Sequence, residues 1–412
     1  MKLAGLLSLV AAEEITRYDG DKVYGFNKLT NGVIAHLKVS NRAYGGLDFW
    51  SPDSPDLMYP GGNANIRVPS EHTEEFEALM ASFDIDFNIR SPNLQLDIDM
   101  ERMNLNRQGR AHSLTNFNDF ETIEAYVKSM GNNDNVKYVE FGKTPEGRNM
   151  MALEIGTGSK AISIDCGIHA REWVADAYCQ WFINEAINGG FAQYTNDVTF
   201  IVQPTLNPDG YAYTWTNQRM WRKNRSKGTG QCYGVDLNRN YDANWGGPGA
   251  SGQSCSDTFR GTAVFSEMES QAQRDYLATW INNGSLKAYL TFHAYGQYIL
   301  YPYSYDYTST APNKAEMNEV GTNMEAAVAA VHRHRYTMGQ GTDVLYAAAG
   351  GSDDWCYDAM QKAGNAAPLS YTVECRDTGT FGFVLPAAEI QPNCEELDAG
   401  LKVLVEYVIA NK

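Results

Sequence analysis

The 412-residue chain lacks any apolar run long enough to cross a lipid bilayer: the run near its N-terminus ends at Val10, and no later stretch suffices. It is also short of basic residues, because 33 Lys and Arg stand against 50 Asp and Glu, a formal net charge of −17. Nucleic acids and anionic membranes attract positively charged surfaces, so this charge argues against both as partners. The sequence has no internal repeat and no low-complexity tract, and its composition is that of a globular protein.

The first residues, "MKLAGLLSLVAAEE", combine one lysine, a short apolar run and small residues ahead of two glutamates. This pattern predicts a secretory signal peptide over residues 1–12, cut near Ala11 or Ala12, and therefore a secreted protein. A buried N-terminal strand or helix is the alternative interpretation.

Cysteine is scarce and odd in number, with seven residues in the chain. An odd count leaves at least one thiol unpaired unless a disulfide joins two chains. Cys232 and Cys255 flank a loop rich in Gly, Asn and Ser, which a disulfide would restrain in an oxidising compartment. Cys166 and Cys179 could pair as well, although their spacing alone is weak evidence.

Residues 13–98 are predicted to form a small α+β module with one helix over 70–83. Its predicted strands are "VIAHLKV" (33–39), "LDFW" (47–50), "NIRVP" (65–69) and "FDIDFNI" (83–89). A polar connector of residues 99–114 follows, helical at first and then exposed around Gly109 and Arg110, where proteolysis is favoured. An inert linker is the alternative interpretation of this connector.

From residue 115 to residue 412, short apolar strands alternate with amphipathic helices. The expected strands cover 161–166, 198–204, 288–292 and 369–375, and the expected helices cover 115–130, 171–187, 266–281, 313–334 and 395–410. This alternation predicts an α/β domain with a mixed, mostly parallel twisted sheet flanked by helices. In such sheets, functional residues gather beyond the carboxyl ends of the strands.

Two of these strand ends carry histidine. His169 and Glu172 follow the strand "AISIDC", and His293 follows the strand "AYLTF". Two histidines and one carboxylate are a suitable ligand set for zinc that leaves one position for water. An H-x-x-E pair alone is common, and a polar turn between strand and helix is the alternative, but a second histidine at a neighbouring strand end favours the metal site.

Carboxylates at two further positions complete the predicted chemistry. Glu374 ends the strand "LSYTV" and is placed to act as a general base, with a salt bridge to nearby basic residues as the alternative. Asp236 in "GVDLNRN" could accept a hydrogen bond from a metal-bound imidazole and fix its orientation.

Arginines are concentrated in one part of this acidic chain: Arg171, Arg219, Arg222, Arg225 and Arg239. A solvated basic face is the usual interpretation of such a run. Arg beside Asn and Gly also suggests an anion site, because a guanidinium binds a carboxylate through two parallel hydrogen bonds. The C-terminal carboxylate is the one obligatory anion of a peptide, so metal, base and arginines together predict removal of C-terminal residues.

The chain resembles the zinc metallocarboxypeptidases of the pancreatic A/B type, in the form of a secreted proenzyme. The resemblance covers nearly everything after the predicted signal peptide. Its specific motifs are "GIHAREW", "TLNPDG", "RMWRKNRS", "GVDLNRNYD", "TFHAYGQ", "LYAAAGGSDDW" and "VECRDTGTFGF". The His₂Glu ligand set is itself characteristic of this family, so the metal prediction and the resemblance are not independent.

The resemblance implies a role for each matching residue. One Zn²⁺ per chain would be bound by His169, Glu172 and His293, with Glu374 as general base. Arg222 would polarise the scissile carbonyl. The terminal carboxylate would be held by Asn238, Arg239 and Tyr346, and neighbouring subsites would be lined by Arg171, Tyr295 and Phe383.

The resemblance further implies that residues 13–98 are an inhibitory prodomain and that a trypsin-like protease cuts at Arg110. It implies the disulfides Cys232–Cys255 and Cys166–Cys179, the second as in B-type members. The partners would then be peptide and protein C-termini and the activating protease, and a monomer is the default expectation.

Asp353 in "GGSDDW" occupies the pocket-floor position where A-type enzymes carry an apolar residue. A buried carboxylate would pair with Lys or Arg and penalise apolar side chains, and Ser304 and Gly341 also match B-type pocket positions. We therefore expect B-type cleavage of C-terminal Lys and Arg, as in protein digestion. The alternative is that Asp353 caps the helix that follows.

Some features stay outside this interpretation. Residues 361–369 form a longer segment than is usual in the family and could reshape the pocket rim, and no pairing is assigned to Cys356, Cys375 or Cys394. Asn224 and Asn283 begin Asn-X-Ser triplets, although Asn224 lies inside a presumed substrate motif, which argues against a glycan there. A catalytically silent peptide-binding relative and a hormone-trimming carboxypeptidase are the competing hypotheses.

Overall fold

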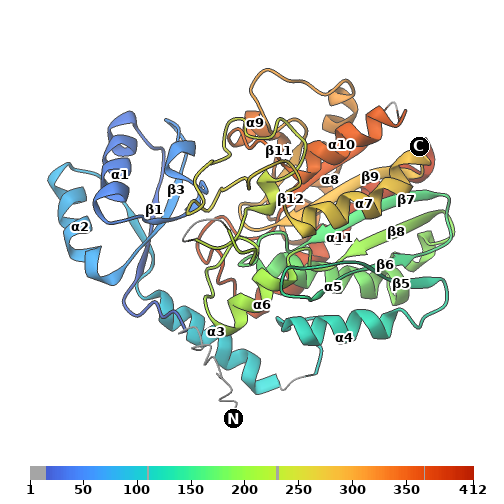
Figure 1. Cartoon of the computed structure of the whole chain (residues 1–412), viewed down its shortest axis with the longest axis horizontal. Coiled ribbons are helices and arrows are strands. Elements are labelled where there is room, and N and C mark those ends of the chain that lie inside the picture. Colours follow the sequence, from blue (N-terminus) through green and yellow to red (C-terminus); the bar gives the residue numbers. More distant parts are fainter. Residues whose placement is uncertain (1–14, 109–110, 229–231, 366) are drawn as a thin grey trace, which may run out of the picture.

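Two sheets of different size organise the chain (Figure 1). The computed structural model describes residues 15–108, 111–228, 232–365 and 367–412. The predicted signal peptide and the predicted cleavage residue Arg110 lie outside these residues. The small module lies at the left of Figure 1, the large domain lies at the right, and helix α3 (Leu94–Gln108) leads from the first toward the second.

The small module is a four-stranded antiparallel sheet covered by two helices. Its strands lie in the order β2 (Asp48–Ser51), β3 (Ala64–Val68), β1 (Lys22–Phe26) and β4 (Asn88–Ser91), and its helices are α1 (Asn31–Ala43) and α2 (Thr73–Ser82). Because side chains alternate along a strand, Tyr24 packs against the helices while Val23 and Trp50 belong to the core of the large domain. The module therefore covers the large domain with one face of its sheet.

Part of the strand prediction for this module was wrong. Residues 33–39 lie in helix α1, which begins after Thr30, whose hydroxyl accepts a hydrogen bond from the Val33 N–H. This cap fixes the start of a helix in a segment whose apolar residues also resemble a strand. The predicted strand over 83–89 begins only at Asn88, and strand β1 was not predicted.

The large domain contains an eight-stranded mixed sheet. Its order is β11 (Thr337–Gln340), β10 (Tyr298–Tyr301), β12 (Leu369–Glu374), β9 (Leu286–His293), β7 (Lys160–Cys166), β8 (Val198–Gln203), β6 (Asn149–Ile155) and β5 (Val136–Lys143). The four central strands β12, β9, β7 and β8 are parallel, whereas β10, β6 and β5 pair antiparallel with neighbours. The predicted fold class is confirmed, although β5, β6, β10 and β11 were not predicted.

Helices cover both faces of this sheet. Helices α5 (Trp173–Asn188), α8 (Lys314–His332) and α11 (Ile390–Asn411) pack on one face, and α7 (Met268–Asn282) and α10 (Ser352–Lys362) pack on the other. The shorter helices are α4 (Phe120–Met130), α6 (Pro208–Thr216) and α9 (Gly341–Val344). Helix α4 begins later than predicted because Asp119 caps it through the Thr122 N–H.

Two disulfides are present, Cys166–Cys179 and Cys232–Cys255, as the resemblance implied. Cys356, Cys375 and Cys394 are free and buried. Within the described ranges, none of the helices combines the length and hydropathy needed to cross a bilayer.

A hydrogen bond locates the segment 361–369. Asn365 donates a hydrogen bond to the carbonyl of Leu286, the first residue of β9, whereas the candidate ligand His293 is the last residue of that strand. The described part of this segment therefore contacts the opposite edge of the sheet. The sequence left open whether this segment reshapes the pocket rim, and this contact places Asn365 at the other edge.

Candidate active site

The carboxyl ends of three adjacent parallel strands, β7, β9 and β12, bring the candidate residues to one edge of the sheet. His293 and Glu374 end β9 and β12 and are paired in the register of these strands. His169 follows β7, and Glu172 occupies the N-cap position of α5. These residues come together because parallel strands that are in register end at the same edge.

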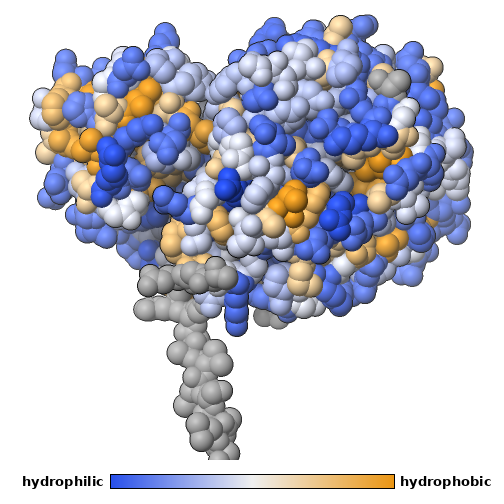
Figure 2. All heavy atoms as spheres, turned by 45° about the horizontal axis from the view of Figure 1, so that its top comes forward, coloured by the Kyte–Doolittle hydropathy of each residue, from blue (hydrophilic) through white to orange (hydrophobic). Residues whose placement is uncertain are grey.

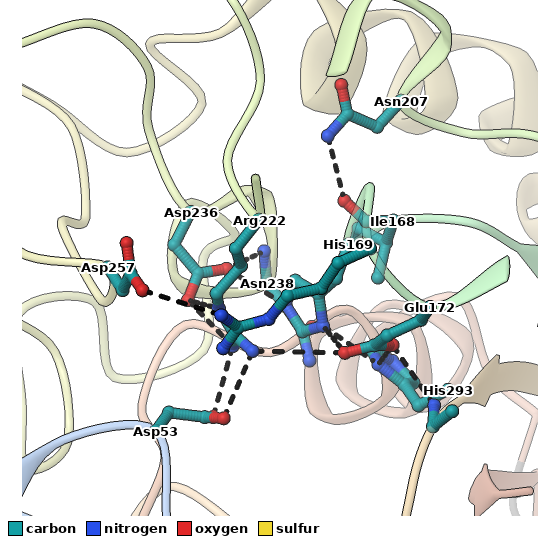
Figure 3. A network of polar contacts seen from close by, with 12 residues as sticks. Asp53, Ile168, His169, Glu172, Asn207, Arg222, Asp236, Asn238, Asp257 and His293 are labelled. Atoms are coloured by element: carbon teal, nitrogen blue, oxygen red, sulfur yellow. Dashed lines mark hydrogen bonds and ion pairs between the residues drawn. The ribbon is translucent and has the colours of Figure 1, made fainter. Parts of the chain in front are cut away.

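His169, Glu172 and His293 converge on one point (Figure 3). The Nδ1 atom of His169 lies 2.8 Å from Oε1 of Glu172, and the Nδ1 atom of His293 lies 3.2 Å from Oε2 of Glu172. The two Nδ1 atoms are 3.2 Å apart, and all three side chains are buried.

This group fits a tetrahedral zinc ion. Bonds of about 2.0–2.1 Å from a tetrahedral zinc place two ligand atoms about 3.3 Å apart, close to the separations seen here. The three side chains supply two imidazole nitrogens and one carboxylate, which is a ligand set that leaves one position open. The backbone N–H of Ala294 donates to Oε2 of Glu172 and helps to fix the carboxylate.

The other ring nitrogen of each histidine also has a partner. Nε2 of His169 lies 3.1 Å from Oδ1 of Asp236, the residue predicted for this contact, and Nε2 of His293 lies 3.2 Å from Oγ1 of Thr291. These contacts leave both Nδ1 lone pairs directed at the common point. Burial opposes ionisation of Asp236, but the charges of Arg222 and His169 outweigh it and hold the pKa of this carboxyl well below its usual value.

Arg222 lies between two carboxylates, as Figure 3 shows. Its guanidinium donates to Oδ2 of Asp236 at 3.0 Å and, through both terminal nitrogens, to the two carboxylate oxygens of Asp53 at 3.1 Å. Asp53 belongs to the small module, in the turn after β2. The same carboxylate accepts hydrogen bonds from Arg239 at 3.5 Å and from the Tyr346 hydroxyl at 3.3 Å.

Asp53 therefore occupies the anion site that the arginines predicted. Sequence reasoning missed it because the contact joins residues far apart in the chain. The available signal was the acidic turn "SPDSPD", which only its fold places opposite the arginine cluster.

Other residues of the small module contact the three residues that we expected to line neighbouring subsites. Asp48 accepts a hydrogen bond from Arg171 at 3.0 Å, and the Asn65 amide donates to the Tyr295 hydroxyl at 2.9 Å. The rings of Trp50 and Phe383 lie 5.1 Å apart. Each of the three residues expected to line these subsites is thus in contact with the small module.

A cavity of about 70 Å³ lies beside the converging histidines. The candidate residues among its lining are Asp53, His169, Arg222, Asn238, Arg239, His293, Ser304, Gly341, Tyr346, Asp353 and Glu374. Burial, together with the charges of Glu172 and Asp53, raises the pKa of Glu374 well above its usual value.

Asp353 lines this cavity with 3% of its surface exposed. Its Oδ2 atom is buried and has no hydrogen-bond partner among the described residues. The adjacent Asp354 is satisfied, because both of its oxygens accept from the Ser304 N–H. Gly341 is required beside this wall, since a Cβ there would lie 2.0 Å from Oγ of Ser304.

Asn238 is oriented by its neighbours. Its side-chain oxygen accepts a hydrogen bond from the Ser352 N–H at 2.9 Å. This contact fixes which end of the amide is the oxygen, so the NH₂ group points away from Ser352. The Arg239 guanidinium donates to the Asn238 carbonyl at 2.9 Å and to the Gly249 carbonyl at 3.1 Å. Both side chains are thereby fixed at the edge of the cavity.

Two arginines of the predicted cluster lie elsewhere. Arg219 is buried and donates to both carboxylate oxygens of Glu101 in α3, at 2.7 and 3.0 Å. The Arg225 guanidinium stacks on the ring of Tyr213, 3.5 Å from its centroid. Arg219 therefore anchors the connecting helix, and Arg225 packs away from the cavity.

Comparison with protein families agrees with this geometry. Residues 123–400 match the family described as zinc carboxypeptidase, and residues 33–101 match the family described as carboxypeptidase activation peptide.

Similar proteins match over nearly the full chain. Carboxypeptidase B of Bos taurus is 38% identical over 405 residues, covering 95% of this chain and 94% of the relative. Carboxypeptidase A2 of Rattus norvegicus is 37% identical, covering 98% and 97%. Among solved structures, thrombin activatable fibrinolysis inhibitor matches with a TM-score of 0.88 at 31% identity, covering 96% of this chain and 100% of that one. Carboxypeptidase A from Helicoverpa armigera matches with a TM-score of 0.83 at 30% identity, covering 97% and 99%.

Proposed function

Because the chain belongs to the zinc carboxypeptidase family and carries an activation peptide ahead of its catalytic domain, we propose that it is the secreted zymogen of an enzyme that removes C-terminal Lys and Arg. The observation that carries the specificity is the buried, unpartnered Oδ2 atom of Asp353 in the cavity beside the histidines. A role in protein digestion and a monomeric state are part of the same proposal.

The metal ligands in this proposal are His169, Glu172 and His293. A bound zinc ion supplies Lewis acidity toward water and toward a carbonyl oxygen. Asp236 and Thr291 hold the two imidazoles in the orientation that directs Nδ1 at the ion. The protein contributes the geometry of this site, because it holds three buried metal-ligand side chains in place through further hydrogen bonds.

Proton transfer is assigned to Glu374. Its carboxylate takes a proton from the attacking water and passes it to the leaving amine. Arg222 donates hydrogen bonds toward the scissile carbonyl and stabilises the negative charge that develops on its oxygen. Asp236 fixes the Arg222 guanidinium for this task through the hydrogen bond at 3.0 Å.

Substrate binding is assigned to the groups around Asp53. Asn238, Arg239 and Tyr346 hold the C-terminal carboxylate of the substrate once Asp53 has left. In the zymogen, Arg239 and Tyr346 donate to the carboxylate of Asp53, and Asn238 lines the same cavity. Arg171, Tyr295 and Phe383 contact residues further along the peptide.

Activation follows from the same contacts. The proposed cut near Arg110, by a trypsin-like protease, separates the small module from the catalytic domain. The groups that Asp48, Asp53 and Asn65 cover then become accessible to peptides. Until that cut, the small module excludes substrate from the cavity.

The choice between B-type and A-type specificity depends on Asp353, because both types occur among the similar proteins. A cationic side chain reaching the cavity floor would give Oδ2 of Asp353 the partner that it lacks. An apolar side chain would leave that buried carboxylate unpaired, and burial already raises its pKa.

The test compares trypsin-activated enzyme and its Asp353→Ala variant on hippuryl-Arg and hippuryl-Phe. Loss of one partner of a buried charge pair costs about 2–5 kcal/mol, so the Arg-over-Phe ratio of kcat/KM should fall at least about 30-fold. Asp343→Ala is the matched control, since its side chain is 64% exposed on helix α9 and its loss should leave the ratio unchanged. An unchanged ratio in Asp353→Ala would refute the assignment, and no metal-dependent release of any C-terminal residue would favour a silent peptide-binding relative.

A further inference from the structure

The two Asn-X-Ser triplets of the chain lie in opposite environments. Asn224 is fully buried, and its Nδ2 donates to Glu267 at 2.8 Å and to Glu269 at 3.1 Å. Its Oδ1 accepts the Val235 N–H at 2.8 Å. A sugar on Nδ2 would displace both carboxylates and would have to be accommodated inside the protein.

Asn283 lies directly after helix α7 and is exposed. Its Oδ1 accepts the Ser285 N–H at 2.8 Å, and its Nδ2 donates no hydrogen bond within the described residues. The space beside it is open, since a Cβ added at Gly284 would meet no atom within 4 Å. The triplet precedes Leu286, the first residue of β9, and so lies at the sheet edge opposite His293. An eight-residue strand separates the two by on the order of 20 Å.

We propose that Asn283 is an N-glycosylation site of this protein and that Asn224 is not. The inference depends on the proposed secretion, because the co-reactant is an oligosaccharide linked to a lipid pyrophosphate in the secretory pathway. In the transfer, Nδ2 of Asn283 bonds to the anomeric carbon and loses one proton, and the lipid pyrophosphate leaves. A glycan at this edge does not obstruct the cavity that holds Asp353.

The test is the intact mass of the full chain, secreted from a eukaryotic host, before and after peptide N-glycosidase treatment. Wild type and Ser226→Ala should lose the mass of one glycan, whereas Asn283→Gln and Ser285→Ala should show no shift. Enzymatic removal converts the glycosylated Asn into Asp, so peptide mapping identifies the modified residue. A secreted, activatable protein without a glycan, or a shift that depends on Ser226, overturns this inference alone. Failure to be secreted overturns the proposed localisation as well.

A second inference concerns a chain of buried hydrogen bonds behind His293. Asp165 and Thr291 face each other in the register of β7 and β9, and both are fully buried. The Thr291 hydroxyl donates to Oδ1 of Asp165 at 2.7 Å and lies 3.2 Å from Nε2 of His293. Oδ2 of Asp165 accepts from the Gln273 amide at 3.0 Å.

This arrangement selects one tautomer of His293. A hydroxyl has a single proton, and Thr291 gives that proton to a carboxylate that can only accept. Its oxygen is then free to accept the Nε2–H of His293, which leaves the Nδ1 lone pair facing Glu172 and His169. Gln273 is itself fixed, because its oxygen accepts the Tyr241 hydroxyl at 2.5 Å.

We infer that Asp165 and Thr291 are positioning residues that set the metal-binding tautomer of His293. This inference rests on the proposed metal site. Asp165→Asn should reverse the direction of these hydrogen bonds. Because Gln273 is fixed, the Asn oxygen faces the Gln273 amide and the Asn NH₂ group faces Thr291. The Thr291 hydroxyl then donates to Nε2 of His293, which favours the tautomer with a proton on Nδ1.

The measurement is the zinc dissociation constant, determined by competition with a chelator, together with the unfolding temperature of the metal-free protein. Loss of such an outer partner weakens metal binding about 10–100-fold, so Asp165→Asn and Thr291→Val should show this loss and Thr291→Ser should retain the wild-type value. Activity should recover at saturating zinc. The matched control is Asp209→Asn, because Asp209 is also buried and accepts a threonine hydroxyl, from Thr144 at 2.6 Å, away from any candidate ligand. Zinc affinity in Asp165→Asn within twofold of wild type overturns the inference, and a zinc-binding failure of wild type overturns the proposed metal site itself.

Discussion

Replacing Asp53 by Asn tests how the small module holds the catalytic domain inactive. Asp53 contributes two hydrogen bonds of 3.1 Å to Arg222 and weaker contacts to Arg239 and Tyr346, with only 16% of its side chain exposed. Asn keeps the shape and one acceptor but removes the negative charge. The closed state of the zymogen should therefore be destabilised relative to the open state.

The size of this effect follows from the contacts. A hydrogen bond to a charged group contributes about 1.5–3 kcal/mol, and the substitution removes one such bond together with the ionic character of the other. We take about 2 kcal/mol for the net loss, which corresponds to an increase of about 30-fold in the open fraction. The basal activity of the uncleaved zymogen should rise by the same factor.

The assay is hydrolysis of hippuryl-Arg by full-length protein carrying Arg110→Gln, with intact mass confirming that no cleavage has occurred. Asp56→Asn is the matched control, because Asp56 follows Asp53 in the same turn but its side chain is 86% exposed and contacts only Lys38 among the described residues. Its basal activity should stay within about twofold of the parent. Equal basal activities of the Asp53→Asn and Asp56→Asn proteins would refute the reasoning.

Three further outcomes are expected. A zinc chelator such as o-phenanthroline should abolish the activity of trypsin-activated protein and added zinc should restore it; activity that survives the chelator would contradict the metal site. Replacing Cys232 and Cys255 by Ser, which opens a loop with a sequence separation of 23, should lower the free energy of unfolding by about 3 kcal/mol in denaturant titration. Burial raises the pKa of Glu269 to about 8 from the ordinary 4.5, so between these pH values the folded state holds a proton that the unfolded state has released. Stability then falls as pH rises through this window, and wild type should lose more of its unfolding free energy from pH 5 to pH 8 than Glu269→Gln, which an equal pH dependence would contradict.

The convergence of His169, Glu172 and His293 was predictable because its determinants are local. His293 is the last residue of an apolar strand, and His169 and Glu172 lie in the turn that follows another. The rule that parallel strands end at one edge converts these sequence positions into spatial proximity. His169 and Glu172 are close in sequence, and His293 is placed by the register of β9 with β7. No knowledge of side-chain packing was needed to group them.

The small module and its contacts were less predictable. The segment 33–39 has apolar residues compatible with either a strand or a helix, and a single cap at Thr30 decides between them. The contact of Asp53 with Arg222 depends on how the small module packs against the large domain, which no periodicity in the sequence encodes. Figure 2 shows hydrophobic side chains exposed on the small module, although one face of its sheet packs on its own helices and the other on the large domain.

The charges around the cavity connect the proposed inhibition with the proposed specificity. Arg222 and Arg239 line the cavity and bind an anion, and the carboxyl group of Asp353 lines the same cavity. A peptide ending in Lys or Arg presents both complementary charges, a carboxylate for the arginines and a cation for Asp353. Asp53 presents only the carboxylate, so the small module satisfies the arginines while Oδ2 of Asp353 stays without a partner. Under the proposed function, Asp53 imitates the carboxylate half of a substrate, and Asp353 is the group that would distinguish basic C-terminal residues from apolar ones.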